Sequence, residues 1–181
     1  TVKRRIASLR PMRRPAPWEQ ELYDGTTTTF EKLARPDYAY AVGVMDDHKI
    51  LLVRDEQPDR DWVITPAGGK VDGDESPEAA ARREFREETG YEVETVKPWF
   101  QYRPNKKVEM RIHAFVAKGL KKAGEATPEG GERLSPLTYT FDEFVALGEE
   151  PRLRDWMLKV RLLEASLRPE KKETIRRLFY G

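Results

Sequence analysis

The stretch GKVDGDESPEAAARREFREETGY, residues 69–91, carries the clearest structural signals in the chain. Ser76 is a good N-cap residue, and Pro77 suits the first helical position, where a missing N–H group costs nothing. Gly90 supplies the left-handed conformation at which helices commonly stop, and Tyr91 begins an extended run. The stretch therefore predicts a glycine turn, a charged loop and a helix that ends before Gly90.

One face of this helix is expected to carry three carboxylates. Glu84, Glu87 and Glu88 fall within a sector of about 100°, since successive residues turn by roughly 100°. Like charges at this spacing repel one another, and Arg83 alone does not neutralise three acids. Hard divalent cations such as Mg²⁺ take oxygen ligands, commonly a few carboxylates together with substrate phosphates. The face therefore predicts a site for a divalent cation.

The same residues fill every position of a known motif, the Nudix box, whose pattern is GX5EX7REUXEEXGU with U apolar or aromatic. The positions are occupied here by Gly69, Glu75, residues 83–88, Gly90 and Tyr91. The chain is thereby identified as similar to Nudix hydrolases. The alternatives are a solvated acidic helix and a Nudix fold kept only for binding; the fixed spacings argue against the first and the intact acidic positions against the second.

The resemblance implies an α/β fold, a Nudix-type α/β/α sandwich around a mixed sheet with an N-terminal β-hairpin extension. The hairpin and residues 66–68, Pro-Ala-Gly, resemble the branch that hydrolyses ADP-ribose and nucleoside diphosphate sugars. This implies metal-dependent cleavage of a pyrophosphate bond to nucleoside monophosphate and sugar phosphate. Nucleoside triphosphates, dinucleoside polyphosphates and capped RNA are alternative substrates. A catalytically silent nucleotide-binding regulator is an alternative of a different class.

The chemistry assigns roles to the box residues. A metal clamp can neutralise pyrophosphate oxygens and orient an attacking water. We expect Mg²⁺, with Mn²⁺ able to substitute. The expected metal ligands are Glu84 and Glu88, with support from Glu87, and the resemblance adds the backbone carbonyl of Ala67. Arg83 is expected to hold the carboxylates in place, and Glu75 to anchor the loop.

Further substrate contacts are expected outside the helix. Gly68 and Gly69 let the backbone approach metal and phosphates closely, which a Cβ atom would obstruct. The resemblance places a catalytic glutamate on a mobile loop, here 121–134, and Glu132 is preferred over Glu125 and Glu129 because Gly130 and Gly131 beside it can act as hinges. Arg54 is the expected substrate-binding arginine, with an ordinary surface role as its alternative.

The resemblance to this branch implies that the N-terminal hairpin forms a homodimer and contributes to the base pocket. Trp18, Tyr23 and Phe30 are candidates to stack on a nucleobase, with packing inside the hairpin as the alternative role for each. The chain start is rich in arginine and proline, and it is interpreted as a basic arm rather than a transit peptide.

Composition excludes several classes of protein. The chain has 181 residues, 38% hydrophobic and 36% charged, and a formal net charge of +1, which favours neither a nucleic-acid binder nor a strongly charged funnel. The absence of cysteine excludes disulfides and thiolate catalysis. No apolar run approaches membrane-spanning length. These facts fit a soluble cytoplasmic protein, and the resemblance to Nudix hydrolases implies a small-molecule nucleotide as its substrate.

We expect three segments: an arm and hairpin over 1–35, a Nudix core over 36–150, and C-terminal helices packed on the core over 151–181. Strands are expected at 38–45, 49–54, 62–65, about 91–102 and 108–117. A polar loop is expected at 55–61, and helices at 141–147, 152–167 and 169–179.

Overall fold

A mixed β-sheet forms the centre of the computed structural model, which describes residues 16–58, 60–127 and 133–181. Its strands are β3 (Tyr38–Val44), β4 (Ile50–Gln57), β5 (Arg60–Thr65), β6 (Ala67–Lys70), β7 (Tyr91–Tyr102), β9 (Ile112–Lys122) and β10 (Arg133–Tyr139). The order is β10-β4-β3-β9-β7, with β5 paired to β4 and β6 paired to β3. Only β3 and β9 are parallel among the strand pairs of this sheet that the structure describes.

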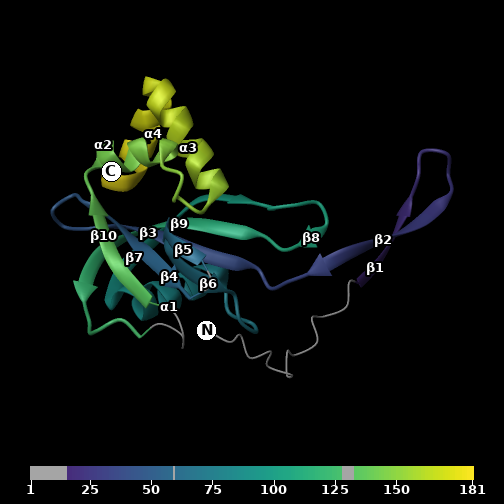
Figure 1. Ribbon diagram of the computed structural model, residues 1–181, viewed down its shortest axis with the longest axis horizontal. Coiled ribbons are helices and arrows are strands. Elements are labelled where there is room, and N and C mark those ends of the chain that lie inside the picture. Colours follow the sequence, from purple (N-terminus) through teal and green to yellow (C-terminus); the bar gives the residue numbers. More distant parts are fainter. Residues whose placement is uncertain (1–15, 59, 128–132) are drawn as a thin grey trace.

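Alternating side chains divide the core into two halves, one on each face of the sheet. In β4, Ile50 and Leu52 belong to one half, whereas Leu51 and Val53 belong to the other. Helix α1, at Pro77–Thr89, packs on the second half. The first half is covered by α2 (Phe141–Ala146), α3 (Trp156–Leu167) and α4 (Pro169–Tyr180), as Figure 1 shows. The structure confirms the α/β/α sandwich around a mixed sheet.

Helix α1 begins and ends where its sequence signals predict. The Ser76 hydroxyl accepts a hydrogen bond from the Ala79 N–H at 3.1 Å. At the other end Gly90 has a φ of 72°, a conformation that favours glycine, and its N–H donates to the Arg86 carbonyl. Ala80, Ala81 and Phe85 are fully buried against the sheet. The acidic residues of the helix are thereby fixed on its remaining faces.

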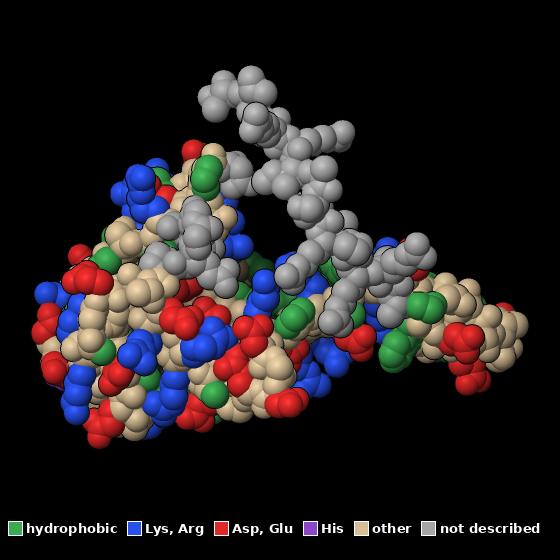
Figure 2. Space-filling view, turned by 90° about the horizontal axis from the view of Figure 1, so that it is seen from below, with side chains coloured by type: hydrophobic (Ala, Val, Ile, Leu, Met, Phe, Trp, Pro, Cys, Tyr) green, Lys and Arg blue, Asp and Glu red, His purple; other side chains and the backbone are tan. Residues whose placement is uncertain are grey.

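An N-terminal hairpin projects from the body of the molecule (Figure 1). It consists of β1 (Ala16–Glu21) and β2 (Thr27–Ala34), and β2 also pairs with the short strand β8 (Val108–Glu109). The hairpin exposes large apolar side chains: Trp18 is 42% exposed and Phe30 48% exposed. Hydrophobic side chains are visible on this arm in Figure 2. The predicted hairpin extension is confirmed.

The predicted continuous strand over 108–117 is wrong. It is divided into β8, which pairs with the hairpin, and β9, which pairs with β3. The chain changes sheets between them because Arg111 is tied to the start of β3. Its N–H donates to the Asp37 carboxylate at 2.7 Å, and its carbonyl accepts from the Tyr38 N–H at 2.9 Å.

Two further boundaries differ from the prediction and shape the site. The polar loop expected at 55–61 is largely strand, since β4 runs to Gln57 and β5 begins at Arg60. The helix expected from 152 begins at Trp156, because Asp155 caps it by accepting from the Leu158 N–H at 2.7 Å. Before the cap, the Arg154 N–H donates to the Ile64 carbonyl at 2.9 Å and ties this segment to β5. The short strand β6 was not predicted.

The C-terminal helices share their core with the sheet. Leu158, Leu162 and Phe179 are almost fully buried in the same cluster as Val42 and Ile50. No helix in the described part of the chain has both the length and the apolar character needed to cross a membrane. The cytoplasmic location stays a prediction.

Candidate active site

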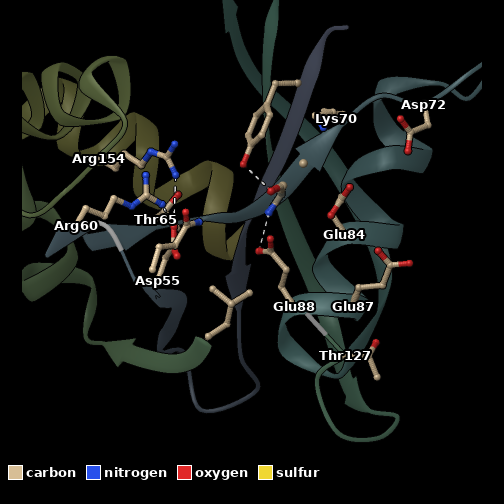
Figure 3. Close-up of a pocket in the computed structure, with 15 residues that line it drawn as sticks. Asp55, Arg60, Thr65, Lys70, Asp72, Glu84, Glu87, Glu88, Thr127 and Arg154 are labelled. Atoms are coloured by element: carbon tan, nitrogen blue, oxygen red, sulfur yellow. Dashed lines mark hydrogen bonds and ion pairs between the residues drawn. The ribbon is translucent and has the colours of Figure 1, made fainter. Parts of the chain in front are cut away.

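A cavity of about 450 Å³ opens between α1 and the strands β4 and β5, a size in the usual range for ligand sites (Figure 3). Side chains of opposite charge line its two sides. From α1 come Glu84, Glu87 and Glu88, and from β6 come Gly68, Gly69 and Lys70. Across from them lie Asp55, Arg60 and Arg154. We call the first set of carboxylates the acidic wall, and Asp55 with its two arginines the arginine wall.

Arg83 organises the acidic wall. Its Nη1 atom lies 2.7 Å from Glu84 Oε1 and 3.2 Å from Glu87 Oε2, while its Nη2 atom lies 2.8 Å from Glu75 Oε1. Glu75 also accepts from the Asp72 N–H at 2.8 Å, which anchors the loop before the helix. The hydrogen bond from Arg83 lowers the pKa of Glu75, and the carboxylates of Glu75 and Glu84 raise the pKa of Arg83. Glu75 and Arg83 therefore remain an ion pair near neutral pH.

The glycine strand β6 presses directly onto this helix. The Gly68 N–H donates to Glu88 Oε2 at 3.0 Å, and the Gly68 carbonyl accepts from the Tyr38 hydroxyl at 2.5 Å. A Cβ atom on Gly69 would collide with the carboxylate of Glu84. Burial raises the pKa of Tyr38, so this hydroxyl keeps its proton and remains a donor. The close packing of β6 on β3 and α1 thus requires glycine at both positions.

Asp55 organises the arginine wall. Its side chain is almost fully buried, and Oδ2 accepts from Arg60 Nη2 at 2.6 Å and from Arg154 Nη1 at 3.4 Å. The two arginines come from β5 and from the segment before α3. Because two guanidinium groups share one carboxylate, this wall has a surplus of positive charge. It can bind anionic oxygens such as those of a phosphate group.

Comparison with known proteins identifies the family. A sequence model of the NUDIX domain matches residues 34–177. The chain belongs to the Nudix family. A methanol dehydrogenase activator of Bacillus methanolicus is 32% identical over 140 residues, which cover 75% of each protein. An ADP-ribose pyrophosphatase of Bacillus subtilis (strain 168) is 27% identical over 139 residues, again 75% of each.

The fold also has a counterpart among solved structures. An ADP compounds hydrolase superposes with a TM-score of 0.67 at 20% identity, over 85% of each chain. At this identity the likeness concerns the Nudix fold alone. It supports the architecture seen around the central sheet.

The residues of the Nudix box fit a divalent cation. The acidic wall offers carboxylate oxygens, which are the ligands that Mg²⁺ prefers, and Asp72 lines the same cavity. Among the described residues, no three carboxylate or imidazole side chains meet closely enough to hold an ion as they stand. Glu84 and Glu87 instead form ion pairs with Arg83, and Glu88 accepts a hydrogen bond from the Gly68 N–H. Ala67 is buried in β6 next to the cavity, and its expected carbonyl ligation stays a prediction.

Other predicted substrate contacts lie away from this cavity. Arg54 does not line it; its guanidinium lies over the Trp62 ring at 4.6 Å and pairs with Glu56. Trp18, Tyr23 and Phe30 lie on the hairpin, and none of them lines the cavity of its own chain.

The expected catalytic Glu132, with Glu129, lies outside the described residues. Glu125 is exposed and lines a separate cavity beside Arg86 and Gly90. Thr127 and Leu134, one on each side of the segment that contains Glu132, both line the main cavity. The role of Glu132 therefore remains a prediction.

Sequence reasoning missed the arginine wall. Arg60 was expected in a polar loop and Arg154 inside a helix. Neither was therefore recognised as a residue that lines the cavity. The available signal was Asp55: it lies two residues after the apolar run 50–53, and a buried carboxylate requires a cationic partner. The partner itself could not be identified from spacing.

Proposed function

We propose that this Nudix protein is a divalent-metal-dependent hydrolase that cleaves the pyrophosphate bond of ADP-ribose or a related nucleoside diphosphate sugar. The observation that carries the proposal is the pairing of an acidic wall and an arginine wall across one cavity. A diphosphate can place one phosphate near the carboxylates and the other near the arginines. The relative named ADP-ribose pyrophosphatase supports this substrate class.

The chain's own residues have distinct tasks in the proposed reaction. Bound Mg²⁺, held by Glu84, Glu88 and Glu87 with the Ala67 carbonyl, would neutralise phosphate oxygens and act as a Lewis acid. Arg83 keeps the carboxylates of Glu84 and Glu87 oriented toward the cavity. Arg60 and Arg154 bind the oxygens of the other phosphate, in substrate and in product.

Hydrolysis then exchanges one bond for another. A new P–O bond forms from water to one phosphorus while the bridging P–O bond breaks, and the bridging oxygen leaves with the second phosphate. We propose Glu132 as the group that takes the proton of the attacking water, as a general base does. The products are a nucleoside monophosphate and a sugar phosphate.

The hairpin supports a homodimer as part of this proposal. Its exposed apolar side chains would be covered if each hairpin lay on a second copy of the chain, and Trp18 and Phe30 could then reach the partner's ligand. Sedimentation at micromolar concentration tests this arrangement. A dimer that becomes monomeric when residues 1–35 are deleted supports it, and a monomeric full-length chain contradicts it.

A substrate panel with product identification tests the activity. ADP-ribose, nucleotide sugars, nucleoside triphosphates, a dinucleoside polyphosphate and a capped RNA are incubated with Mg²⁺, and again with Mn²⁺. Release of nucleoside monophosphate plus sugar phosphate supports the proposal. Turnover confined to triphosphates or capped RNA would replace the substrate class, and binding without turnover would indicate a silent regulator.

The relative named methanol dehydrogenase activator favours a second candidate, the regulation of a dehydrogenase. The chain is added to a methanol dehydrogenase and the rate of alcohol oxidation is measured. A rise in rate that disappears with Glu88→Gln would mean that activation depends on hydrolysis. A rise that survives this change would mean that activation occurs by binding alone.

A further inference from the structure

Arg154 of the arginine wall lies outside the helices and strands, in the short segment between Leu153 and α3. Its guanidinium approaches the Asp55 carboxylate only to 3.4 Å, whereas Arg60 approaches it to 2.6 Å, and the Arg154 side chain is 52% exposed. A side chain held so loosely depends on its backbone for its position in the cavity. On one side that backbone is fixed, because the Arg154 N–H donates to the Ile64 carbonyl at 2.9 Å.

Asp155, the next residue, fixes the other side with both oxygens of its carboxylate. Oδ1 accepts from the Leu158 N–H at 2.7 Å and caps α3. Oδ2 accepts from the Tyr102 hydroxyl at 2.6 Å, although Tyr102 lies 53 positions earlier, in β7. An N-cap needs only one acceptor, so the second bond has a separate consequence. It attaches the segment that carries Arg154 to the central sheet.

Tyr102 is well placed to hold this carboxylate. Its ring meets the Trp156 ring edge to face, with centroids 5.2 Å apart, which limits the positions open to the hydroxyl. Burial and the hydrogen bond to Asp155 raise the pKa of Tyr102, so the hydroxyl keeps its proton and stays a donor. A hydrogen bond from a hydroxyl to a carboxylate is stronger than one between neutral groups. The Tyr102 hydroxyl is thereby linked to Arg154 through one hydrogen bond and one peptide bond.

We propose that Tyr102 is a positioning residue for diphosphate binding: through Asp155 it fixes the backbone from which Arg154 reaches into the main cavity. The inference rests on the proposed function, which supplies the diphosphate that Arg154 binds. Without the bond, the Arg154 guanidinium can occupy more positions, and fixing it when a ligand binds lowers the affinity. Tyr102 also borders a second cavity of about 320 Å³ that shares Arg154 with the first, so the experiment must separate positioning from direct contact with a ligand.

Tyr102→Phe is the first variant, because it removes the hydroxyl but keeps the ring and the cap of α3. Calorimetry with methylenediphosphonate and Mg²⁺ measures diphosphate affinity without turnover, and steady-state rates with ADP-ribose give KM and kcat. We expect the affinity to fall about three- to fivefold and KM to rise equally, with kcat unchanged. Tyr180→Phe is the matched control, because its hydroxyl donates to the His48 carbonyl at 2.8 Å and Tyr180 lines neither cavity.

A double-mutant cycle with Arg154→Gln decides whether Tyr102 acts through that arginine. If it does, Tyr102→Phe should have almost no further effect once Arg154 is replaced. An equal loss in both backgrounds would mean that Tyr102 contacts the ligand or acts elsewhere, and it overturns the proposal. An unchanged affinity in Tyr102→Phe overturns it too, as does an unaltered chain that does not bind methylenediphosphonate. Non-additive losses in a chain that hydrolyses none of the tested nucleotides uphold the positioning role and reject the hydrolase function.

Two changes at Asp155 separate positioning from capping. Asp155→Ala removes both hydrogen bonds and should lower both the affinity for methylenediphosphonate and the thermal midpoint of unfolding. Asp155→Ser restores a good N-cap, but the serine hydroxyl is too short to reach Tyr102 as well. Its thermal midpoint should return toward that of the unaltered chain while its affinity stays low. Recovery of both quantities in Asp155→Ser would show that the cap alone positions Arg154, and it would overturn the role of Tyr102.

Discussion

The two walls of the main cavity use the same construction with opposite signs. On the acidic wall one arginine, Arg83, holds the carboxylates of Glu75, Glu84 and Glu87. On the arginine wall one carboxylate, Asp55, holds Arg60 and Arg154. In each case one charged side chain forms ion pairs with several side chains of the opposite charge. Each wall is left with a surplus that a ligand can neutralise.

The walls differ in the burial of the central ion. The Arg83 side chain is 32% exposed, whereas the Asp55 side chain is 6% exposed. Water therefore screens the contacts of Arg83 more than those of Asp55. The carboxylates that pair with Arg83 are therefore the more easily released to a cation, whereas burial holds the Asp55 carboxylate in place. We therefore expect the arginine wall chiefly to bind anionic oxygens, and the acidic wall to exchange Arg83 for a metal ion when the metal and substrate enter.

Removing charge from the acidic wall should have the largest effect. Glu88→Gln keeps the size of the side chain and an oxygen that can accept from the Gly68 N–H, but it removes a carboxylate ligand. We expect kcat to fall roughly 10²–10³-fold, as when one electrostatic stabiliser is removed, with a native circular dichroism spectrum. Glu78→Gln is the control, because Glu78 pairs with Arg82 away from the cavity. Near-normal turnover of Glu88→Gln would show that the acidic wall is not the metal site.

The two walls do not by themselves provide a separate base for the attacking water, a role proposed for Glu132. If Glu132 removes the proton of the attacking water, Glu132→Gln should lower kcat about 10²-fold while KM changes little. Glu125→Gln and Glu129→Gln are internal controls and should be nearly silent. Loss of activity in a control would move the role to that residue. Normal turnover in all three variants and in the triple variant would leave water activation to the acidic wall and the metal.

The acidic wall was predictable because it is local. Its members lie within one capped helix, so spacing alone places Glu84, Glu87 and Glu88 together. The α/β/α sandwich was predictable because the residues of this helix and its flanking loop match the Nudix box, and the resemblance to Nudix hydrolases implies that fold. Arg83 was expected to hold the carboxylates and Glu75 to anchor the loop, but the hydrogen bond between Arg83 and Glu75 was not itself predicted.

The arginine wall was not predictable because it is assembled from distant segments. Asp55 and Arg154 are 99 positions apart, and the contact depends on where the chain turns before α3. The sequence from Asp55 to Asp61 is typical of a polar loop. Most of it is nevertheless strand, because β4 pairs with β5 and the Asp55 carboxylate is buried. The choice of Arg54 found the correct strand, but adjacent strand residues face opposite sides, and it is Asp55 that lines the cavity.

Weakening the arginine wall should affect binding more than chemistry. Arg154→Gln removes one guanidinium and leaves Asp55 paired with Arg60 at 2.6 Å, so the fold should persist. We expect KM for the diphosphate substrate to rise about tenfold with kcat little changed, because the interaction is present in both substrate and transition state. Arg54→Gln is the matched control on the neighbouring strand and should leave KM unaltered. A rise in KM for Arg54→Gln alone would return the phosphate contact to the originally predicted arginine.

The smallest effect concerns the stability that Arg83 gives to the loop before the acidic wall. Glu75 has a pKa below its ordinary value of 4.5, chiefly because Arg83 donates to it. A carboxyl group whose folded pKa is lowered stabilises the fold above its unfolded pKa, and this contribution is lost as pH falls through the folded pKa. Glu75→Gln should therefore lower the thermal midpoint by roughly 2–4 °C at pH 7, and the difference from the unaltered chain should shrink below about pH 4.5.

Glu173→Gln is the control for this last change. Glu173 pairs with Arg177 at 3.0 Å on the exposed face of α4, where solvent screens the pair, so its midpoint should hardly move at either pH. Thermal denaturation of the three proteins across pH measures the difference. A Glu75→Gln deficit that stays constant down to low pH would mean that its carboxylate charge contributes nothing, and that the loop is held by shape and the Asp72 hydrogen bond. A deficit that vanishes with protonation would show that Arg83 stabilises the loop and the acidic wall through the same charge.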